Sequence, residues 1–157
     1  MTDATDLTLD KPQAAALDLG GLDQLLGFHL RLAHVAIYRD FAACMAQVDL
    51  NQMRFATLRL ISANPGVSQV DLAATLGTDR ATMMAMIDRL EQRHLVVRQR
   101  STADRRRQEL KLTAEGETLL AKAHKMILEH EKRFTERMSK TELAGLVNGL
   151  RAIHHQV

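Results

Sequence analysis

Arginines are concentrated in one short stretch of the chain, RQRSTADRRRQ, which begins at position 98. An arginine side chain is always charged, and its planar fork of N–H donors matches the oxygens of a phosphate group. Residues 95–98 and 108–112 on either side read as two strands, which predicts a β-hairpin with an arginine-rich loop. This pattern favours a polyanionic partner. The five arginines that stand within ten residues here are Arg98, Arg100, Arg105, Arg106 and Arg107.

The positive charge of the chain is local. The 157 residues contain 21 Lys and Arg against 19 Asp and Glu, so that the formal net charge is only +2. Residues 80–111 hold nine basic against four acidic residues, a net of +5, whereas residues 1–27 hold five aspartates against one lysine, a net of −4. A local positive field attracts polyanions whatever the total charge of the molecule.

Two short helices are expected directly before the hairpin, at residues 68–76 and 78–93. Ala73 stands where they would cross and Gly77 where the backbone must turn, which is the spacing of a helix-turn-helix. The second helix has the right size for a DNA major groove, which is about 12 Å wide. A hairpin that follows directly makes the unit a winged helix-turn-helix, whose arginines would contact phosphates and an adjacent minor groove.

Local sequence signals mark where these two helices begin. Ser68 is followed by Asp71 in a pattern that resembles a capping box, with Asp in place of the usual Glu. Thr78 is the expected N-cap of the second helix, which would run from Asp79 to about Arg93. The side chains expected to face the core from the second helix are Met83, either Met86 or Ile87, and Leu90.

Long amphipathic helices are expected on both sides of this unit. Apolar residues recur in steps of three and four from Leu19 to Val48, which predicts one long helix, and residues 51–63 fit a second. Thr113 would cap a helix of about 25 residues, or roughly 37 Å at 1.5 Å per residue. Ser139 and Glu142 form a capping box before a last helix. A helix that long with an apolar stripe needs a partner surface, which favours a dimer.

Three parts of the sequence resemble the MarR family of bacterial transcription regulators: VSQVDLAATLGTDRATMMAMIDRLEQRHLVVRQR, DRRRQELKLTAEG and the flanking long helices. The resemblance covers nearly the whole chain after residue 19, and the D-x-R wing followed by L-T-x-x-G is its most specific part. His94 departs from the pattern, since the family usually has Gly there to leave the helix. His takes a left-handed conformation only at some cost, so slight strain is expected at this turn.

The resemblance implies roles for individual residues. Arg106 would enter the minor groove from the wing tip, and Asp104 would hold it by a charge-assisted hydrogen bond. Arg98 would support the wing or touch phosphate, and Thr82 would face the major groove. Met83 stays open between a base contact and a core position. The full expected DNA-binding set is Ser68, Gln69, Thr78, Asp79, Arg80, Ala81, Thr82, Met83, Arg98, Asp104, Arg105, Arg106 and Arg107.

The resemblance also implies a homodimer and a small-molecule effector. Two wings related by a two-fold axis would meet half-sites of a pseudo-palindromic duplex about 34 Å apart. Family members often bind aromatic carboxylates, phenols or their thioester derivatives. Arg31, His34 and Tyr38 share one side of the first helix, where Arg31 would pair with a carboxylate and Tyr38 would hydrogen-bond to it. Arg39 and His29 could help if the ligand carries phosphates; surface charge beside a core edge is the alternative.

Oxidant sensing, metal binding and catalysis are three further functions that the residue types could suggest. Cys44 lies on the apolar stripe of the first helix, which favours a buried, inert thiol over an oxidant sensor. His130-Glu131-Lys132-Arg133-Phe134 lacks the second His of a zinc motif, so zinc sensing is a weak alternative and no metal or cofactor is expected. No phosphate loop, G-x-S-x-G or carboxylate pair invites catalysis, and an enzyme is not expected.

The expected architecture is therefore mainly α with a small β-hairpin wing, a winged helix-turn-helix protein that is dimeric through its N- and C-terminal helices. It is expected to be a cytoplasmic repressor released from double-stranded DNA by an aromatic or anionic effector, with no membrane span. A rival is a ligand-binding or protein-interaction module of the same fold without DNA binding. The expected organisation is an acidic tail at 1–18, a dimerisation helix at 19–50, the DNA-binding domain at 51–112 and dimerisation helices at 113–157.

Overall fold

The computed structural model describes residues 17–100 and 108–154, and it is mainly helical with one two-stranded hairpin. This confirms the fold class that the sequence predicts. The elements follow in the order η1 (Leu22–Gln24), α1 (Leu26–Met45), η2 (Ala46–Val48), α2 (Gln52–Ala63), α3 (Gln69–Thr75), α4 (Arg80–Gln92), β1 (Val96–Arg100), β2 (Gln108–Leu112), α5 (Ala114–Thr135) and α6 (Lys140–His154). Of these, η1 and η2 are 3-10 helices.

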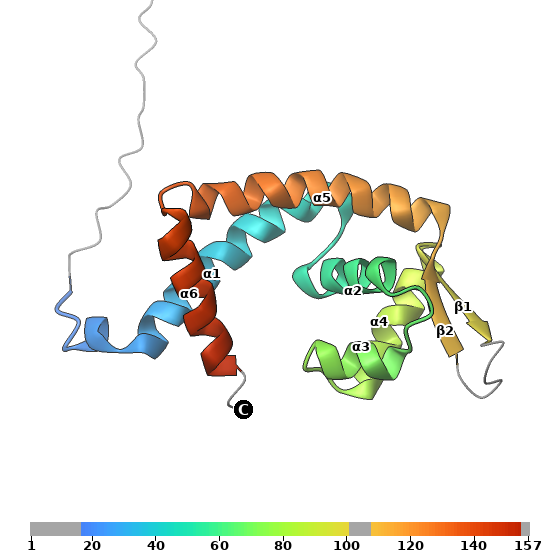
Figure 1. Cartoon of the computed structure of the whole chain (residues 1–157), viewed down its shortest axis with the longest axis horizontal. Helices are drawn as coiled ribbons and strands as arrows, with labels where there is room; N and C mark the ends of the chain where they lie inside the picture. Colours follow the sequence, from blue (N-terminus) through green and yellow to red (C-terminus); the bar gives the residue numbers. More distant parts are fainter. Residues whose placement is uncertain (1–16, 101–107, 155–157) are drawn as a thin grey trace, which may run out of the picture.

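Helix α5 spans the length of the molecule and joins two lobes (Figure 1). Its first half begins next to β2 and packs on α2, above the winged lobe formed by α2, α3, α4, β1 and β2. Its second half lies against α1, which runs in the opposite direction. The helix therefore connects the hairpin rigidly to the lobe that contains α1.

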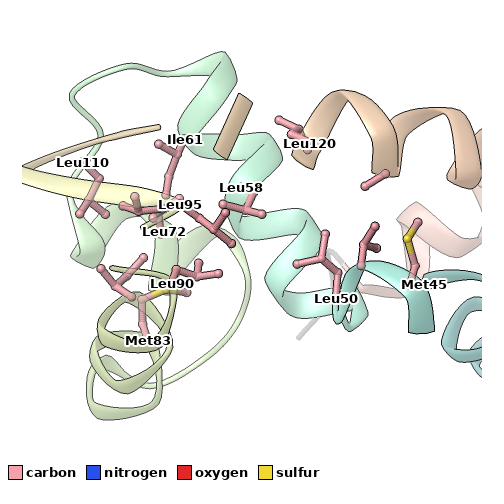
Figure 2. Packing of buried hydrophobic residues seen from close by; sticks show 14 of the residues in the cluster. Met45, Leu50, Leu58, Ile61, Leu72, Met83, Leu90, Leu95, Leu110 and Leu120 are labelled. Carbon is pink, nitrogen blue, oxygen red and sulfur yellow. The ribbon is translucent and has the colours of Figure 1, made fainter. Parts of the chain in front are cut away.

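The core of the winged lobe gathers side chains from every one of its elements. Leu58 of α2, Leu72 of α3, Met83 of α4 and Leu110 of β2 are buried in one cluster. Figure 2 shows Met83 beside Leu90 and below Leu72, with Leu110 closing the cluster on the side of the hairpin. Because the cluster includes α3, α4 and both strands, burial of these apolar side chains fixes the turn, the second helix and the wing as one body.

Two helix boundaries differ from the sequence expectation. The helix expected from Leu19 begins at Leu26, because Gly20 and Gly21 have φ angles of +56° and +86° and Leu25, between η1 and α1, is extended. The expected N-cap Thr78 is wrong: Asp79 is the cap of α4, and its carboxylate accepts a hydrogen bond from the Thr82 amide at 2.8 Å. Both residue types cap helices well, and only the backbone placement distinguishes them.

The other expected caps are confirmed. Ser68 accepts a hydrogen bond from the amide of Asp71, and Thr113 accepts one from the amide of Gly116. At the start of α6, the amide of Ser139 donates to the Glu142 carboxylate at 2.8 Å, and the Glu142 amide donates back to the Ser139 hydroxyl. The helix that Thr113 caps has 22 residues, somewhat fewer than expected, and is roughly 33 Å long.

The wing is an antiparallel pair in which Val96 lies opposite Leu112 and Arg100 lies opposite Gln108. Val67, which precedes α3, forms a further bridge to Leu110, so that the start of the helix-turn-helix is attached to the wing. His94 leaves α4 with a φ of +56°, the left-handed conformation expected from its departure from Gly.

A large apolar surface is uncovered at the end of the molecule away from the wing. None of the residues of α6 is buried, and among the described residues this helix makes no extensive contact with another element. Leu22, Leu25 and Leu26 at the start of the α1 lobe are also exposed. The exposed large apolar side chains of α6 are Leu146, Val147, Leu150 and Ile153. In the described part of the chain, no helix has the length and apolar character needed to cross a membrane.

Candidate nucleic-acid interface

Helices α3 and α4 pack against each other around a small residue and a turn. Ala73 of α3 is buried, as the expected crossing point requires. Gly77 between the helices has a φ of +61°, while a Cβ added there would meet no atom within 4 Å. The glycine is therefore needed for its backbone conformation rather than for space, since L-residues enter this region at a cost. These features give the helix-turn-helix its angle.

Helix α4 turns one face to the core and the opposite face to solvent. Met83, Ile87 and Leu90 are fully buried, so the alternative that placed Met83 in a base contact is wrong. A side chain with no exposed surface cannot touch a base edge. Its neighbour Met84 is 48% exposed and stands on the solvent side with Ala81. Periodicity indicated this arrangement, because residues three and four apart share a helix face.

The first turn of α4 is held by Asp79. Its carboxylate accepts from the amide of Thr82 at 2.8 Å and from the hydroxyl of Thr82 at 2.6 Å. The hydrogen bond from the Thr82 hydroxyl, followed by that from its amide, lowers the pKa of Asp79 below its ordinary value of 3.8. Both residues are exposed, next to Arg80 and Ala81 at the start of the helix. These residues, which were expected to face the groove, are thus brought together at one helix end.

Arg98 fastens the wing to α4. Its guanidinium donates to the carboxylate of Asp88 at 2.5 Å and also to that of Glu91, and its backbone amide donates to Glu91 at 3.3 Å. The side chain is only 18% exposed. Of the two roles expected for Arg98, the ion pairs with Asp88 and Glu91 favour the one as a wing support, and the phosphate contact stays a prediction. Nothing in the local sequence named these partners.

The wing loop itself lies outside the described residues. The expected roles of Asp104, Arg105, Arg106 and Arg107 therefore stay predictions. What the structure does describe is the base of this loop: the two strands that carry it end at Arg100 and begin again at Gln108, both exposed.

Ser68 and Gln69, which belong to the expected DNA-binding set, lie at the start of α3. The Ser68 hydroxyl donates to the Asp71 carboxylate at 2.7 Å and accepts from the Asp71 amide at 3.2 Å. Both Ser68 and Gln69 are half-buried. Thr78, one residue before the N-cap of α4, is also half-buried.

Of the four expected effector residues, Tyr38 lines the cavity described next. Tyr38 borders a cavity of about 180 Å³ between α1, η2 and the start of α2, together with Phe41, Met45, Leu50 and Arg54. The Tyr38 ring is 49% exposed and stacks on His34, with ring centres 6.0 Å apart. The remaining two expected residues, Arg31 and Arg39, are exposed on α1 and do not line the cavity.

A polar cluster between α1 and α5 was not found from the sequence. Nδ1 of His130, which is 1% exposed, lies 2.6 Å from the Asp40 carboxylate, and Arg133 donates to the same carboxylate at 2.7 Å. Hydrogen bonds from Arg133, and then from His130, lower the pKa of Asp40 below 3.8. No local pattern indicates a partner 90 residues away along the chain.

Cys44 is half-buried rather than fully buried as expected, and its thiol is hydrogen-bonded. The Cys44 thiol is half-buried and donates to the carbonyl oxygen of Met126 at 3.3 Å. Among the described residues, no group of three or more His, Cys, Asp and Glu side chains is placed to hold a metal ion.

The class of protein that this geometry defines is a winged helix-turn-helix protein with a long-helix lobe. Residues 50–107 match the model of the MarR family. A putative transcriptional regulatory protein for the hcr operon of Thauera aromatica is 32% identical over 143 residues, which are 90% of this chain and 86% of that protein. The transcriptional regulator HosA of Escherichia coli O157:H7 is 38% identical over 94 residues, which are 60% of this chain and 70% of that protein. The chain belongs to the MarR family.

Solved structures of related proteins share the fold. The transcriptional repressor CouR bound to a 23-mer DNA duplex superposes with a TM-score of 0.84 at 40% identity, over 89% of this chain and 99% of CouR. CouR bound to p-coumaroyl-CoA gives a TM-score of 0.80 at 38% identity, over 90% of this chain and 100% of CouR.

Proposed function

We propose that this protein is a homodimeric transcriptional repressor that binds a pseudo-palindromic DNA duplex. The observation that carries the proposal is the solvent face of α4, held beside a wing whose base is fixed by the Arg98 ion pairs. A related repressor with 40% identity is described as bound to a DNA duplex. The cationic stretch from Arg98 to Arg107 argues against the rival reading as a module without DNA binding.

The proposed dimer uses the apolar surface of α6 and the exposed leucines near the start of α1. Exposed apolar side chains at spacings of three and four along α6 form one stripe, which a soluble helix normally buries against a partner. A two-fold axis at this end of the molecule would place the two winged lobes at its outer ends. Light scattering should give twice the mass of one chain, and Leu150→Asp should shift it to one chain.

DNA binding is tested with duplex fragments taken from beside the gene itself, by gel shift or fluorescence anisotropy. Binding through many phosphate contacts should weaken steeply as salt is raised, because condensed counterions are released on binding. A random duplex of equal length is the control. A protein that ignores every duplex at low ionic strength would refute the proposed function and favour the interaction-module reading.

The proposed effector is a thioester of an aromatic acid. CouR is described as bound to p-coumaroyl-CoA, and here Tyr38 borders a cavity between α1 and α2 whose lining is partly apolar and partly polar. Its volume of about 180 Å³ is smaller than the roughly 300–1,000 Å³ of typical ligand sites. We infer that the cavity takes the aromatic ring, while the rest of the ligand lies outside, near His34 and the exposed Arg31 and Arg39.

A release assay tests this assignment. A CoA thioester of an aromatic acid should release the duplex at a concentration where free CoA and the free acid do not. Such a ligand acts only by binding the released form better than the DNA-competent one. Tyr38→Ala should weaken release while leaving DNA affinity unchanged. An oxidant-sensing role for Cys44 is tested in the same assay: a response to peroxide that persists in Cys44→Ser excludes it.

A further inference from the structure

The solvent face of α4 is apolar along its centre. Ala81, Met84 and Ala85 are all exposed; helical spacing places Ala81 and Ala85 opposite the buried Met83, and Met84 at the edge of the same exposed face. Met84 is the largest of them and is 48% exposed. An exposed methionine beside two alanines offers methyl and methylene surface to whatever this helix contacts.

The polar side chains beside this strip are already hydrogen-bonded within the protein. The Thr82 hydroxyl donates its proton to Asp79 at 2.6 Å, so it has none left to donate to a base. Asp88, one turn beyond Met84, accepts from Arg98 at 2.5 Å. A carboxylate held by a guanidinium is a poor additional acceptor for the amino group of a cytosine.

Two arginines flank the strip. Arg80 precedes Ala81 on one edge and Arg89 follows on the other, and both are exposed. Neither forms an ion pair with another residue in the ranges 17–100 and 108–154. Cations on both sides of an apolar strip suit a helix in a major groove, where phosphates line the two walls and base edges form the floor.

We propose that Met84, with Ala81 and Ala85, reads thymine methyl groups in the major groove of each half-site. The C5-methyl of thymine is the one apolar group on that floor, and apolar side chains recognise it by contact. This inference rests on the proposed DNA binding and deepens it, since it assigns part of the sequence specificity to a methionine and to burial of a methyl group.

The test begins with selection from a pool of randomised duplexes at low ionic strength, which requires no known operator. Each thymine in the selected half-site is then replaced by uracil, which removes the methyl group and leaves the base pair intact. Burying one methyl group corresponds to about fourfold in affinity, so replacement in both half-sites should weaken binding about fifteenfold.

Met84→Gln tests whether this side chain makes the contact. It keeps the length of the side chain and the helix propensity, and the uracil penalty should fall below about twofold. Met138→Gln is the matched control, because Met138 is also an exposed methionine but lies outside α4, and it should keep the full penalty. Circular dichroism establishes that both variants are folded.

Each outcome decides the inference. Selection of a defined duplex that binds equally well with thymine or uracil at every position overturns the methyl readout and leaves the proposed function intact. A uracil penalty that persists undiminished in Met84→Gln overturns the assignment to Met84. Failure to select any duplex overturns the proposed function and the inference together.

Discussion

Arg98 and Asp88 form an ion pair at 2.5 Å that joins the first strand of the wing to the recognition helix α4. The guanidinium also contacts Glu91 one turn further along the same helix. An arginine from the most cationic part of the sequence is therefore used inside the protein, and the wing is held in place by it.

Replacing Arg98 by Ala should weaken DNA binding about tenfold, or about 1.4 kcal/mol, because the wing is no longer fixed to α4. The slope of log affinity against log salt should stay unchanged if Arg98 acts only through its pairs with Asp88 and Glu91. Titrations at several salt concentrations measure both quantities. A slope that falls by about one phosphate contact would contradict the internal role of Arg98.

Replacing Arg106 by Ala should behave differently. If Arg106 enters the minor groove, its loss should cost about 1–3 kcal/mol in DNA affinity, and the salt slope should fall by about 1. The thermal midpoint of unfolding should not change. The same salt titration compares the two variants directly, and unchanged DNA affinity in Arg106→Ala would remove it from the interface.

The N-cap of α4 can be tested by stability alone. Asp79→Ala should lower the free energy of unfolding by about 1 kcal/mol, because the amide of Thr82 loses its acceptor. Asp79→Asn keeps an acceptor and should cost much less. Thr78→Ala is the control and should be nearly neutral. Denaturant titration measures all three, and an equal loss in Thr78→Ala would contradict the assignment of the cap.

Gly116 of α5 lies against the backbone of Leu95, the residue before β1. A Cβ at this buried position would overlap the carbonyl oxygen of Leu95, so Gly116→Ala should force the helix away and cost about 3 kcal/mol of stability. Gly149→Ala on α6 is the matched control, because a Cβ there meets nothing within 4 Å. It should be neutral or stabilising by up to about 1 kcal/mol. Thermal unfolding distinguishes them.

The Asp40 cluster predicts a specific sensitivity to acid. Arg133 and His130 lower the pKa of Asp40 in the folded state below 3.8. The ionised Asp40 therefore stabilises the folded state at pH values above 3.8. The contribution is lost as the pH falls through the lowered pKa, in the range below about 3.8. Asp40→Asn should therefore lose less stability than wild type between pH 5 and pH 3, roughly the window in which carboxylates titrate.

Arg133→Ala removes the main cause of the lowered pKa of Asp40 and should flatten the acid profile in the same way. Thermal midpoints measured from pH 7 downward provide the comparison. If Asp40→Asn and wild type lose stability in parallel below pH 4, the coupling of Asp40 to its two partners does not contribute to folding.

The sequence by itself determined the features that depend on near neighbours. Ser68, Thr113 and Ser139 begin helices because their side chains bond amides three residues away, and such bonds require no distant part of the chain. The hairpin follows from alternation and its loop, and the buried face of α4 follows from helical spacing. The left-handed turn at His94 was also predictable from its place at the helix end.

Only the tertiary structure decided which polar groups meet across the chain. The partners of Arg98 and the pairing of Asp40 with His130 depend on how whole helices and strands dock, and hydrophobic burial, which drives docking, is not directional. The packing of α4 on the core also decides that Met83 is buried and Met84 is exposed. Short-range hydrogen bonds are written in consecutive residues, whereas ion pairs between elements arise only after packing has brought their side chains within a few ångströms.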